Sequence, residues 1–272
     1  MKLTFMKTLT VFRNYWRAER GALVGWAVGL AAYAYYISAF YKSTEHDWQP
    51  LLEYLNHMPA GLKALVGGEL SSRTVAGWLR LELLSYLPML ASIYVSIVVA
   101  GIISKEIERG TAEFLFAQPI SRARLVLTRF VGLALNLAIL HLVVFGGAWV
   151  GIASIGEEFP AWVALRTVSV AWLAVMAVAA LLLLISVFVP DYTRTLFTGL
   201  GVSTALYVLT VALRASGREN ALTAWTIFGH YDPAKLVESA SGVWEHAAIL
   251  AATTIVFLTA AVLIFRRRDL RL

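Results

Sequence analysis

Six long apolar stretches constrain this chain more than any other feature of its sequence. Each is about 20 residues long, which is the length that an α-helix needs to cross the hydrocarbon core of a bilayer. Charged residues make up only 15% of the 272 residues, whereas soluble domains carry about 25%. We therefore predict an all-α membrane protein that forms a single domain over residues 1–272 and crosses the membrane six times. The predicted helices cover approximately residues 22–41, 83–104, 126–152, 163–189, 196–213 and 247–265.

Lysine and arginine are unevenly distributed between the two sides of such a protein. If the N-terminus is cytoplasmic, the cytoplasmic segments hold 15 of the 23 Lys and Arg residues but only 6 of the 17 Asp and Glu residues. This asymmetry follows the positive-inside rule, so both termini are expected in the cytoplasm. The net charge of +6 then reflects orientation, and no nucleic-acid partner is expected. The segments counted as cytoplasmic are 1–21, 104–129, 190–195 and 266–272.

Three segments outside the six helices have a predicted structure of their own. Residues 1–21 combine basic residues with a helical apolar stripe. This predicts an amphipathic helix lying on the lipid at the cytoplasmic surface of the membrane, or otherwise a frayed, charged lead-in. Two outer loops, 42–82 and 214–245, are too long to be simple connectors. Within the second, residues 221–229 are too apolar for a solvated loop and too short to cross the membrane. They form either a re-entrant segment shielded by other helices or a helix lying flat at the interface.

Motifs for catalysis and cofactor binding are absent from the sequence. It contains no cysteine, no G-x-x-x-x-G-K-[ST] phosphate-binding loop and no pair of histidines at helical metal-ligand spacing. We therefore expect no catalytic residue, no metal site and no cofactor on this chain. Asn136 and His141, inside the third helix, are expected to hydrogen-bond neighbouring helices, with a functional role as the alternative. No predicted helix has a clear acidic residue at mid-depth, so ion coupling is not expected.

The longest cytoplasmic loop, 104–124, has the local signals of a short helix between two sharp breaks. Gly110 can end the preceding helix, and Thr111 is a suitable N-cap for a new one. Glu113 then lies in the first turn, where the helix dipole favours a negative charge. Pro119 stops this helix after about two turns. The loop is therefore predicted to form a finger that projects from the membrane.

The apolar tip of this finger predicts a protein partner. Phe114, Leu115 and Phe116 follow one another on the short helix, and two turns of helix are not stable alone in water. After the finger, Ser121 can cap the third transmembrane helix, and Arg122 falls on the cytoplasmic side.

The same loop resembles the signature of the ATP-binding-cassette (ABC) type-2 permeases. Its residues read Glu106-x-Glu108-Arg109-Gly110-Thr111-x-Glu113, followed by Gln118-Pro119-Ile120-Ser121-Arg122. Further similarity lies in Leu55-x-x-Met58-Pro59, in Tyr231-Asp232-Pro233 and in the ending Phe265-Arg-Arg-Arg-Asp269. The order of these parts is most similar to that of the six-span subgroup of the family.

The resemblance implies a dimer of permease subunits in the bacterial inner membrane, made of two identical chains or of close paralogues. Each subunit would dock on a separate cytoplasmic ATPase, which binds the ATP and Mg²⁺. The loop would supply the coupling helix, whose apolar anchor is Phe114, Leu115 and Phe116. Ion pairs at the rim of this contact, or braces within the finger, would come from Glu106, Glu108, Arg109 and Arg122. The shape of the finger would be set by Gly110, Thr111, Pro119 and Ser121. Glu113 is also counted among the coupling residues.

By the same resemblance, a transport path would follow the dimer interface between the first, second and fifth helices, most simply for export. Four tyrosines of the first two helices are candidates for lining it: Tyr33, Tyr36, Tyr86 and Tyr94. Two alternatives stay open at this point. One is a subunit that does mechanical or assembly work in an ABC-type complex without transport. The other is a membrane-embedded lipid-modifying enzyme built on His230, Asp232 and Glu238.

Overall fold

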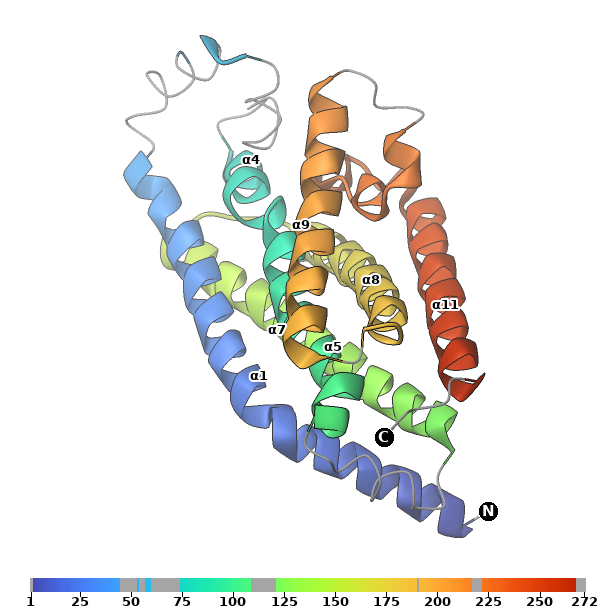
Figure 1. Ribbon diagram of the computed structural model, residues 1–272. Helices are drawn as coiled ribbons and strands as arrows, with labels where there is room; N and C mark the ends of the chain where they lie inside the picture. The colour runs from blue at the N-terminus through green and yellow to red at the C-terminus, as the bar shows by residue number, and fades with distance from the viewer. Residues whose placement is uncertain are drawn as a thin grey trace.

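The computed structural model describes residues 2–44, 53, 57–59, 74–108, 121–189, 191–216 and 222–267, and their side chains except at 2–7, 44, 103–108, 215 and 238. Within these residues, six helical stretches are long and apolar enough to cross a membrane (Figure 1). They are α1 (Lys2–Thr44), α4–η2–α5 (Val75–Leu79, Arg80–Leu84 and Leu87–Glu108), α7 (Arg122–Ser154), α8 (Ala161–Ser186), α9 (Tyr192–Ala215) and α11 (Val243–Arg267). The predicted all-α fold with six membrane-spanning helices is confirmed.

The bundle has two different ends. At one end, which we call the terminal end, α1 begins, α5 ends, α7 begins and α11 ends (Figure 1). The opposite end, which we call the distal end, holds the short helices η3 (Thr223–Trp225), η4 (Ile227–His230) and α10 (Pro233–Glu238).

Helix α1 is longer than one membrane crossing requires. Its 43 residues span about 65 Å at 1.5 Å per residue, roughly twice the thickness of the hydrocarbon core. Figure 1 shows that α1 bends. Its first part runs across the terminal end, and its second part runs along the side of the bundle toward the distal end. The predicted amphipathic segment 1–21 is therefore helical from Lys2 onward and continuous with the first span, and the alternative of a frayed lead-in is not what the structure shows.

The second spanning helix begins earlier than the sequence predicted. Helical structure starts at Val75, rather than near residue 83, so the end of the predicted outer loop 42–82 belongs to the span. The stretch Arg80–Leu84 is wound as a π-helix, and the Ser85 hydroxyl donates a hydrogen bond to the Arg80 carbonyl over 2.6 Å. π-Turns inside helices often mark functional positions, and this one brings Glu82 inside the span.

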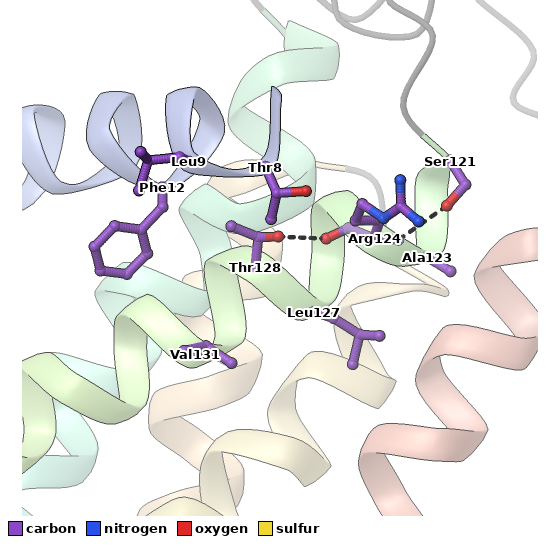
Figure 2. A pocket seen from close by; sticks show the side chains of 9 residues that line it. All are labelled: Thr8, Leu9, Phe12, Ser121, Ala123, Arg124, Leu127, Thr128 and Val131. Atoms are coloured by element: carbon purple, nitrogen blue, oxygen red, sulfur yellow. Dashed lines mark hydrogen bonds between the residues drawn. The ribbon is translucent and has the colours of Figure 1, made fainter. Parts of the chain in front are cut away.

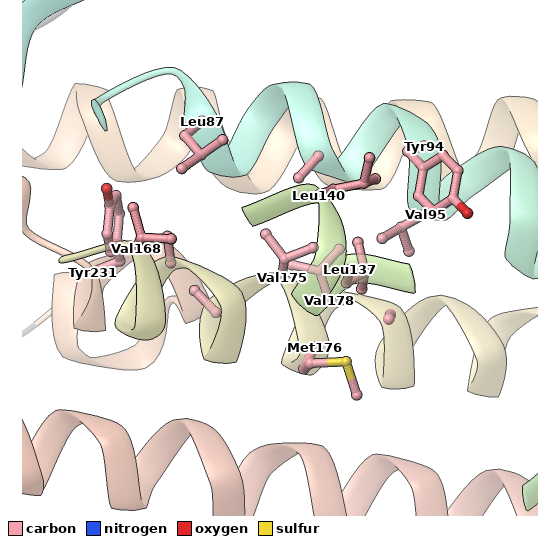
Figure 3. Packing of buried hydrophobic residues seen from close by; sticks show 14 of the residues in the cluster. Leu87, Tyr94, Val95, Leu137, Leu140, Val168, Val175, Met176, Val178 and Tyr231 are labelled. Atoms are coloured by element: carbon pink, nitrogen blue, oxygen red, sulfur yellow. The ribbon is translucent and has the colours of Figure 1, made fainter. Parts of the chain in front are cut away.

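Helices α5 and α8 form the centre of the bundle. In their apolar windows 67% of the residues are buried, against 22% for the α1 and α9 windows and 17% for α11. Small residues make this possible: Ala174, Ala177 and Ala180 of α8 have no exposed surface, and small side chains let helix backbones approach closely in a membrane. In Figure 3, α8 lies between α5 and α11, and a stretch of α7 with Leu137 and Leu140 lies between α5 and α8, beside Val175 and Val178.

Helix α1 lies against α7 along a seam that depends on glycine. A Cβ atom built on Gly147 would come within 2.6 Å of the Ala31 carbonyl oxygen, and one on Gly151 within 2.6 Å of the Tyr35 carbonyl oxygen. Both distances are shorter than real Cβ contacts, so glycine is required for the two backbones to approach this closely.

The apolar segment of the second outer loop folds back into the bundle. Ile227, Phe228 and Tyr231 are buried, and η4 contacts α8, α9 and α11. The structure thus favours the predicted re-entrant arrangement over a helix lying flat on the surface. Irregular backbone at this depth needs hydrogen-bond donors from the protein. Arg214 supplies two of them, because its guanidinium donates to the carbonyls of Phe228 (3.2 Å) and Tyr231 (2.8 Å).

Candidate functional site

The helices that flank the predicted finger are described, whereas the finger itself is not. Helix α5 continues to Glu108, so that Glu106 and Glu108 lie in its last turn, and α7 begins at Arg122. The other predicted coupling residues lie outside the described part of the chain, namely Arg109, Gly110, Thr111, Glu113, Phe114, Leu115, Phe116 and Pro119.

The two flanking helices are fixed where the finger joins them. The Ser121 hydroxyl oxygen accepts a hydrogen bond from the Arg124 backbone N–H over 3.3 Å, which caps α7 as the sequence predicts. One turn further on, the Arg129 guanidinium donates to the Ile102 carbonyl of α5 over 2.6 Å. A charge-assisted bond of this kind is stronger than one between neutral groups. This bond therefore joins α5 to α7 close to the point where the described parts of both helices end.

A groove opens at the terminal end between the first turns of α1 and α7. Its volume is about 510 Å³, and it is lined by Thr8, Leu9 and Phe12 of α1 together with Leu127 and Val131 of α7 (Figure 2). Leu9 is 57% exposed and Val131 54% exposed. The wall of this groove on α7 starts at Ser121, so the groove adjoins the base of the finger.

A second group of polar side chains lies where α1, η2 with the turn that follows it, and α9 meet, nearer the distal end. We call Tyr33, Glu82, Tyr86 and Tyr207 the Glu82 cluster, and all four are half-buried. The Glu82 carboxylate acts electrostatically on the hydroxyls of Tyr33 and Tyr86, and Tyr86 in turn acts on Tyr207. Two of the predicted path residues, Tyr33 and Tyr86, are thus brought together around an acidic side chain.

Two tyrosines of the Glu82 cluster are held in place by backbone carbonyls, one in the π-helix and one at the residue that follows it. The Tyr33 hydroxyl donates to the Glu82 carbonyl over 2.6 Å, and the Tyr207 hydroxyl donates to the Ser85 carbonyl over 3.3 Å. These bonds link α1 and α9 to the same short stretch of backbone and orient both phenol rings.

Tyr231, outside the Glu82 cluster, reaches the same stretch of backbone from the re-entrant segment. Its hydroxyl donates to the Leu84 carbonyl over 2.8 Å. Leu84 needs this donor, because the residue four positions on is Pro88, which has no backbone N–H. The hydroxyl proton of Tyr231 is correspondingly hard to remove, because burial raises its pKa above the usual value.

The two remaining path tyrosines occupy very different environments. Tyr36 is 59% exposed on α1 and stacks on Phe40 with ring centroids 5.5 Å apart. Tyr94 has no exposed surface, and its hydroxyl accepts a hydrogen bond from the Asn136 side-chain amide over 2.9 Å. Tyr94 therefore joins α5 to α7 in the core; Figure 3 shows its position among the buried residues.

The polar residues predicted inside the third spanning helix have two kinds of partner. Asn136 bonds a neighbouring helix through Tyr94, as the sequence analysis expects. His141 instead bonds the Leu137 carbonyl of its own helix over 2.8 Å. Both side chains are buried, and these bonds account for one polar atom of each.

The residues of the alternative enzyme site have structural partners. Asp232 accepts hydrogen bonds from the backbone N–H groups of Ala234 and Lys235, which makes it the N-cap of α10. The Nδ1 atom of His230 lies 3.2 Å from the Nδ1 atom of His246, and the Nε2 atom of His230 lies 2.9 Å from the Ala224 carbonyl oxygen. Burial lowers the pKa of His230, and the neighbouring His246 adds to this shift. The side chain of Glu238 lies outside the described residues.

Sequence reasoning missed three residues that the structure places in these sites: Glu82, Tyr207 and Arg214. The sequence places Glu82 at the end of the outer loop 42–82, because charged residues interrupt the apolar run before residue 83. A usable signal was the apolar stretch Val75–Leu79, which continues the helical pattern backwards past Glu82. Arg214 had a signal too, because a basic residue at the end of a span precedes an apolar segment that is too short to cross the membrane.

Comparison with known protein families gives one match that covers nearly the whole chain. Residues 12–270 match the family described as "ABC-2 family transporter protein". No curated protein matches the chain. The matched range includes all of the predicted finger, the Glu82 cluster and the re-entrant segment.

Proposed function

This chain belongs to the ABC-2 transporter family, and from that premise we propose that it is the permease subunit of an ABC exporter driven by a separate cytoplasmic ATPase. The observation that carries the proposal is the family match over residues 12–270, joined to six helices able to cross a membrane. Membership makes the chain a membrane transport component that is not itself catalytic. Because the sequence has no phosphate-binding loop, ATP and Mg²⁺ would bind to the partner ATPase.

The terminal end is the proposed site of ATPase docking. It carries both ends of the finger, and basic side chains gather there at the start of α7 and the end of α11. Basic residues beside a span favour the cytoplasmic side, in this case of a bacterial inner membrane. The anchor Phe114–Phe116 would fit the ATPase, and the Arg129 bond to Ile102 would carry its movement into α5 and α7.

The proposed partner within the membrane is a second permease subunit. Helices α1 and α9 flank the Glu82 cluster, and only 22% of the residues in each apolar window are buried in the single chain. On α1, a Cβ atom at Gly21, Gly25 or Gly29 would meet nothing within 4 Å. Glycines four residues apart on an apolar helix allow another helix to approach closely. The path would follow this face, past Tyr33, Tyr36 and Tyr86, with membrane lipid covering the remaining outer surfaces.

The ATPase partner is tested by affinity purification from the native membrane in a mild detergent. We expect an ATPase subunit to accompany the chain in a stable complex. The variants Glu106→Lys and Phe114→Asp should release the ATPase or abolish the coupling of its activity to transport, while membrane insertion is unchanged. Phe188→Asp is the matched control, because Phe188 is an exposed aromatic residue in the α8–α9 turn, outside the finger.

Two results would contradict this proposal. One is a purified chain that carries no ATPase under conditions that preserve other membrane complexes. The other is normal ATPase binding and activity in both finger variants. The enzyme alternative is disfavoured by the role of Asp232 as a helix cap. A purely mechanical subunit would bind the ATPase but show no ATP-dependent flux in sealed vesicles.

A further inference from the structure

We propose that the Glu82 cluster is a binding site for the ammonium group of an organic cation. This inference rests on the proposed transport function, because it names a class of substrate for the proposed path. The cluster unites one carboxylate and three phenol rings from α1, the η2 turn and α9, and all four side chains are half-buried. Such a set recognises a cation that is also partly apolar.

The charge of Glu82 calls for a cation from outside the chain. Glu82 lies inside a helix that is apolar enough to cross the membrane. Within the described residues, no ion pair or hydrogen bond to its carboxylate is found. Ionisable side chains at membrane depth are costly and usually paired or placed on a substrate path. A bound ammonium group would supply the missing positive charge.

Two tyrosines of the Glu82 cluster, Tyr33 and Tyr207, are oriented by hydrogen bonds to the backbone. Because the hydroxyls of Tyr33 and Tyr207 donate their protons to backbone carbonyls, their oxygens present only lone pairs to the surroundings. Phenol rings carry negative charge on their faces, and an ammonium ion gains about 0.5–2 kcal/mol from one such contact. The rings of Tyr33 and Tyr207 are already held by bonds to the backbone next to Glu82. Little side-chain conformational entropy is therefore lost when a ligand binds.

The chemistry favours an organic ammonium ion over a bare metal ion. A cation such as Ca²⁺ requires six to eight oxygen ligands, whereas this cluster offers one carboxylate and three phenol oxygens. A quaternary ammonium ion is weakly hydrated and places apolar carbon against the rings. Tyr36 and Phe40 continue the aromatic surface along α1, and the Phe40 and Trp78 ring centroids lie 6.5 Å apart. These rings would accept the apolar part of an amphipathic cation.

The test measures binding to the full-length chain in lipid nanodiscs, without the ATPase. The probe is benzyltrimethylammonium, and its uncharged analogue neopentylbenzene is the reference ligand. We expect the charged probe to bind more tightly than the neutral one, and Glu82→Gln to weaken its binding about tenfold or more. Tyr207→Leu should weaken binding about two- to thirtyfold, and Tyr207→Phe should retain most of it. Glu158→Gln is the matched control, because it removes an exposed carboxylate elsewhere in the chain.

Several outcomes would overturn the inference. They are equal binding of the charged and neutral probes, unchanged affinity in a folded Glu82→Gln variant, and displacement of the probe by millimolar Na⁺ or Ca²⁺. A thermal melt of each variant in the same nanodiscs shows that it is folded. Because the assay contains no ATPase, it separates the two proposals. A chain that brings down its ATPase but binds no cation disproves this inference alone, whereas cation binding without an ATPase partner disproves only the proposed coupling.

Discussion

The distal and terminal ends of this bundle are built on different principles. At the distal end the backbone is irregular, and side chains from distant parts of the sequence bond its free carbonyls: Tyr231 reaches Leu84, and Arg214 reaches Phe228. At the terminal end the helices are regular, Ser121 caps α7 locally, and a groove of about 510 Å³ separates α1 from α7. The distal end is therefore held together by bonds that join the re-entrant segment to η2 and α9, while the terminal end has room to change shape where we propose that the ATPase docks.

The largest effect is expected from a substitution that prevents η3 and η4, at the distal end, from packing together. A Cβ atom at Gly229 would lie 1.9 Å from the Thr223 carbonyl oxygen, which is backbone and cannot move aside. Gly229→Ala should therefore prevent η3 and η4 from folding onto each other and should cost more than about 4 kcal/mol, the range of severe core defects. The measurement is the yield of monodisperse protein in detergent, followed by its thermal melt.

Gly201→Ala is the control for this experiment, because a Cβ at Gly201 meets nothing within 4 Å. It should purify and melt like the unsubstituted protein. A Gly229→Ala variant that melts like the control would show that the distal end is more adaptable than its contacts indicate.

A smaller loss of stability is expected when one arginine of the distal end is removed. Arg214→Met keeps an unbranched side chain but leaves the carbonyls of Phe228 and Tyr231 without their donor. Hydrogen bonds from charged groups contribute about 1.5–3 kcal/mol each, so the two bonds together should be worth about 3 kcal/mol at the lower end of that range. Amide hydrogen exchange over residues 222–238 should accelerate, while exchange in the first turns of α7 is unchanged.

Arg194→Met provides the comparison at the other end of the same helix, where the side chain is exposed. It should alter neither the melt nor the exchange pattern. Faster exchange at both ends in Arg214→Met would mean that the two ends are not independent.

The sequence predicted the parts of this fold that local patterns determine. Six apolar runs identified the six spans, and the excess of apolar residues in 221–229 identified a segment that packs into the bundle. The start of the second span was missed, because its stability depends on Tyr33 and Tyr231, which bond its carbonyls from far along the chain. Tyr94 and Tyr36 looked equivalent in the sequence, since only packing distinguishes a core tyrosine from a surface one.

For the predicted coupling loop, the sequence is more informative than the structure. Its motif was the most informative segment of the sequence, and the cap at Ser121 follows from residue type alone. The Glu82 cluster could not be derived in this way, because it joins residues from α1, η2 and α9. The Ser121 cap lies within one short segment and could be predicted from the sequence, whereas the Glu82 cluster is assembled between helices and needs the structure.

A modest, local effect is expected from removing the cap at the terminal end. Ser121→Ala leaves the Arg124 backbone N–H without its acceptor, and loss of such a cap costs about 0.5–2 kcal/mol. Exchange should accelerate only in the first turn of α7. Ser154→Ala, at the last residue of the same helix, should leave that turn unchanged. Faster exchange in the distal segment of Ser121→Ala would contradict the separation of the two ends.

The smallest effect is a dependence on pH that should be confined to the distal end. Burial lowers the pKa of His230 below its ordinary value of 6.5, with His246 lowering it further, while the Ala224 carbonyl and Glu245 act in the opposite direction. The folded state therefore binds a proton at His230 less readily than the unfolded state does. The stability linked to this group is present above the unfolded pKa and is lost as the pH falls through 6.5 toward the lower, folded value.

Thermal melts between about pH 8 and about pH 5, the range in which histidine titrates, should show this loss. His230→Asn should reduce the slope of stability against pH, because it removes the group that titrates. His57→Asn should not, since His57 is exposed and bonds only the nearby Glu53 carbonyl among the described residues. Hydrogen exchange locates the effect: acid should accelerate exchange in η3 and η4 before it affects the first turn of α7. If both regions respond together, or if His230→Asn leaves the slope unchanged, the distal end does not open as a separate unit.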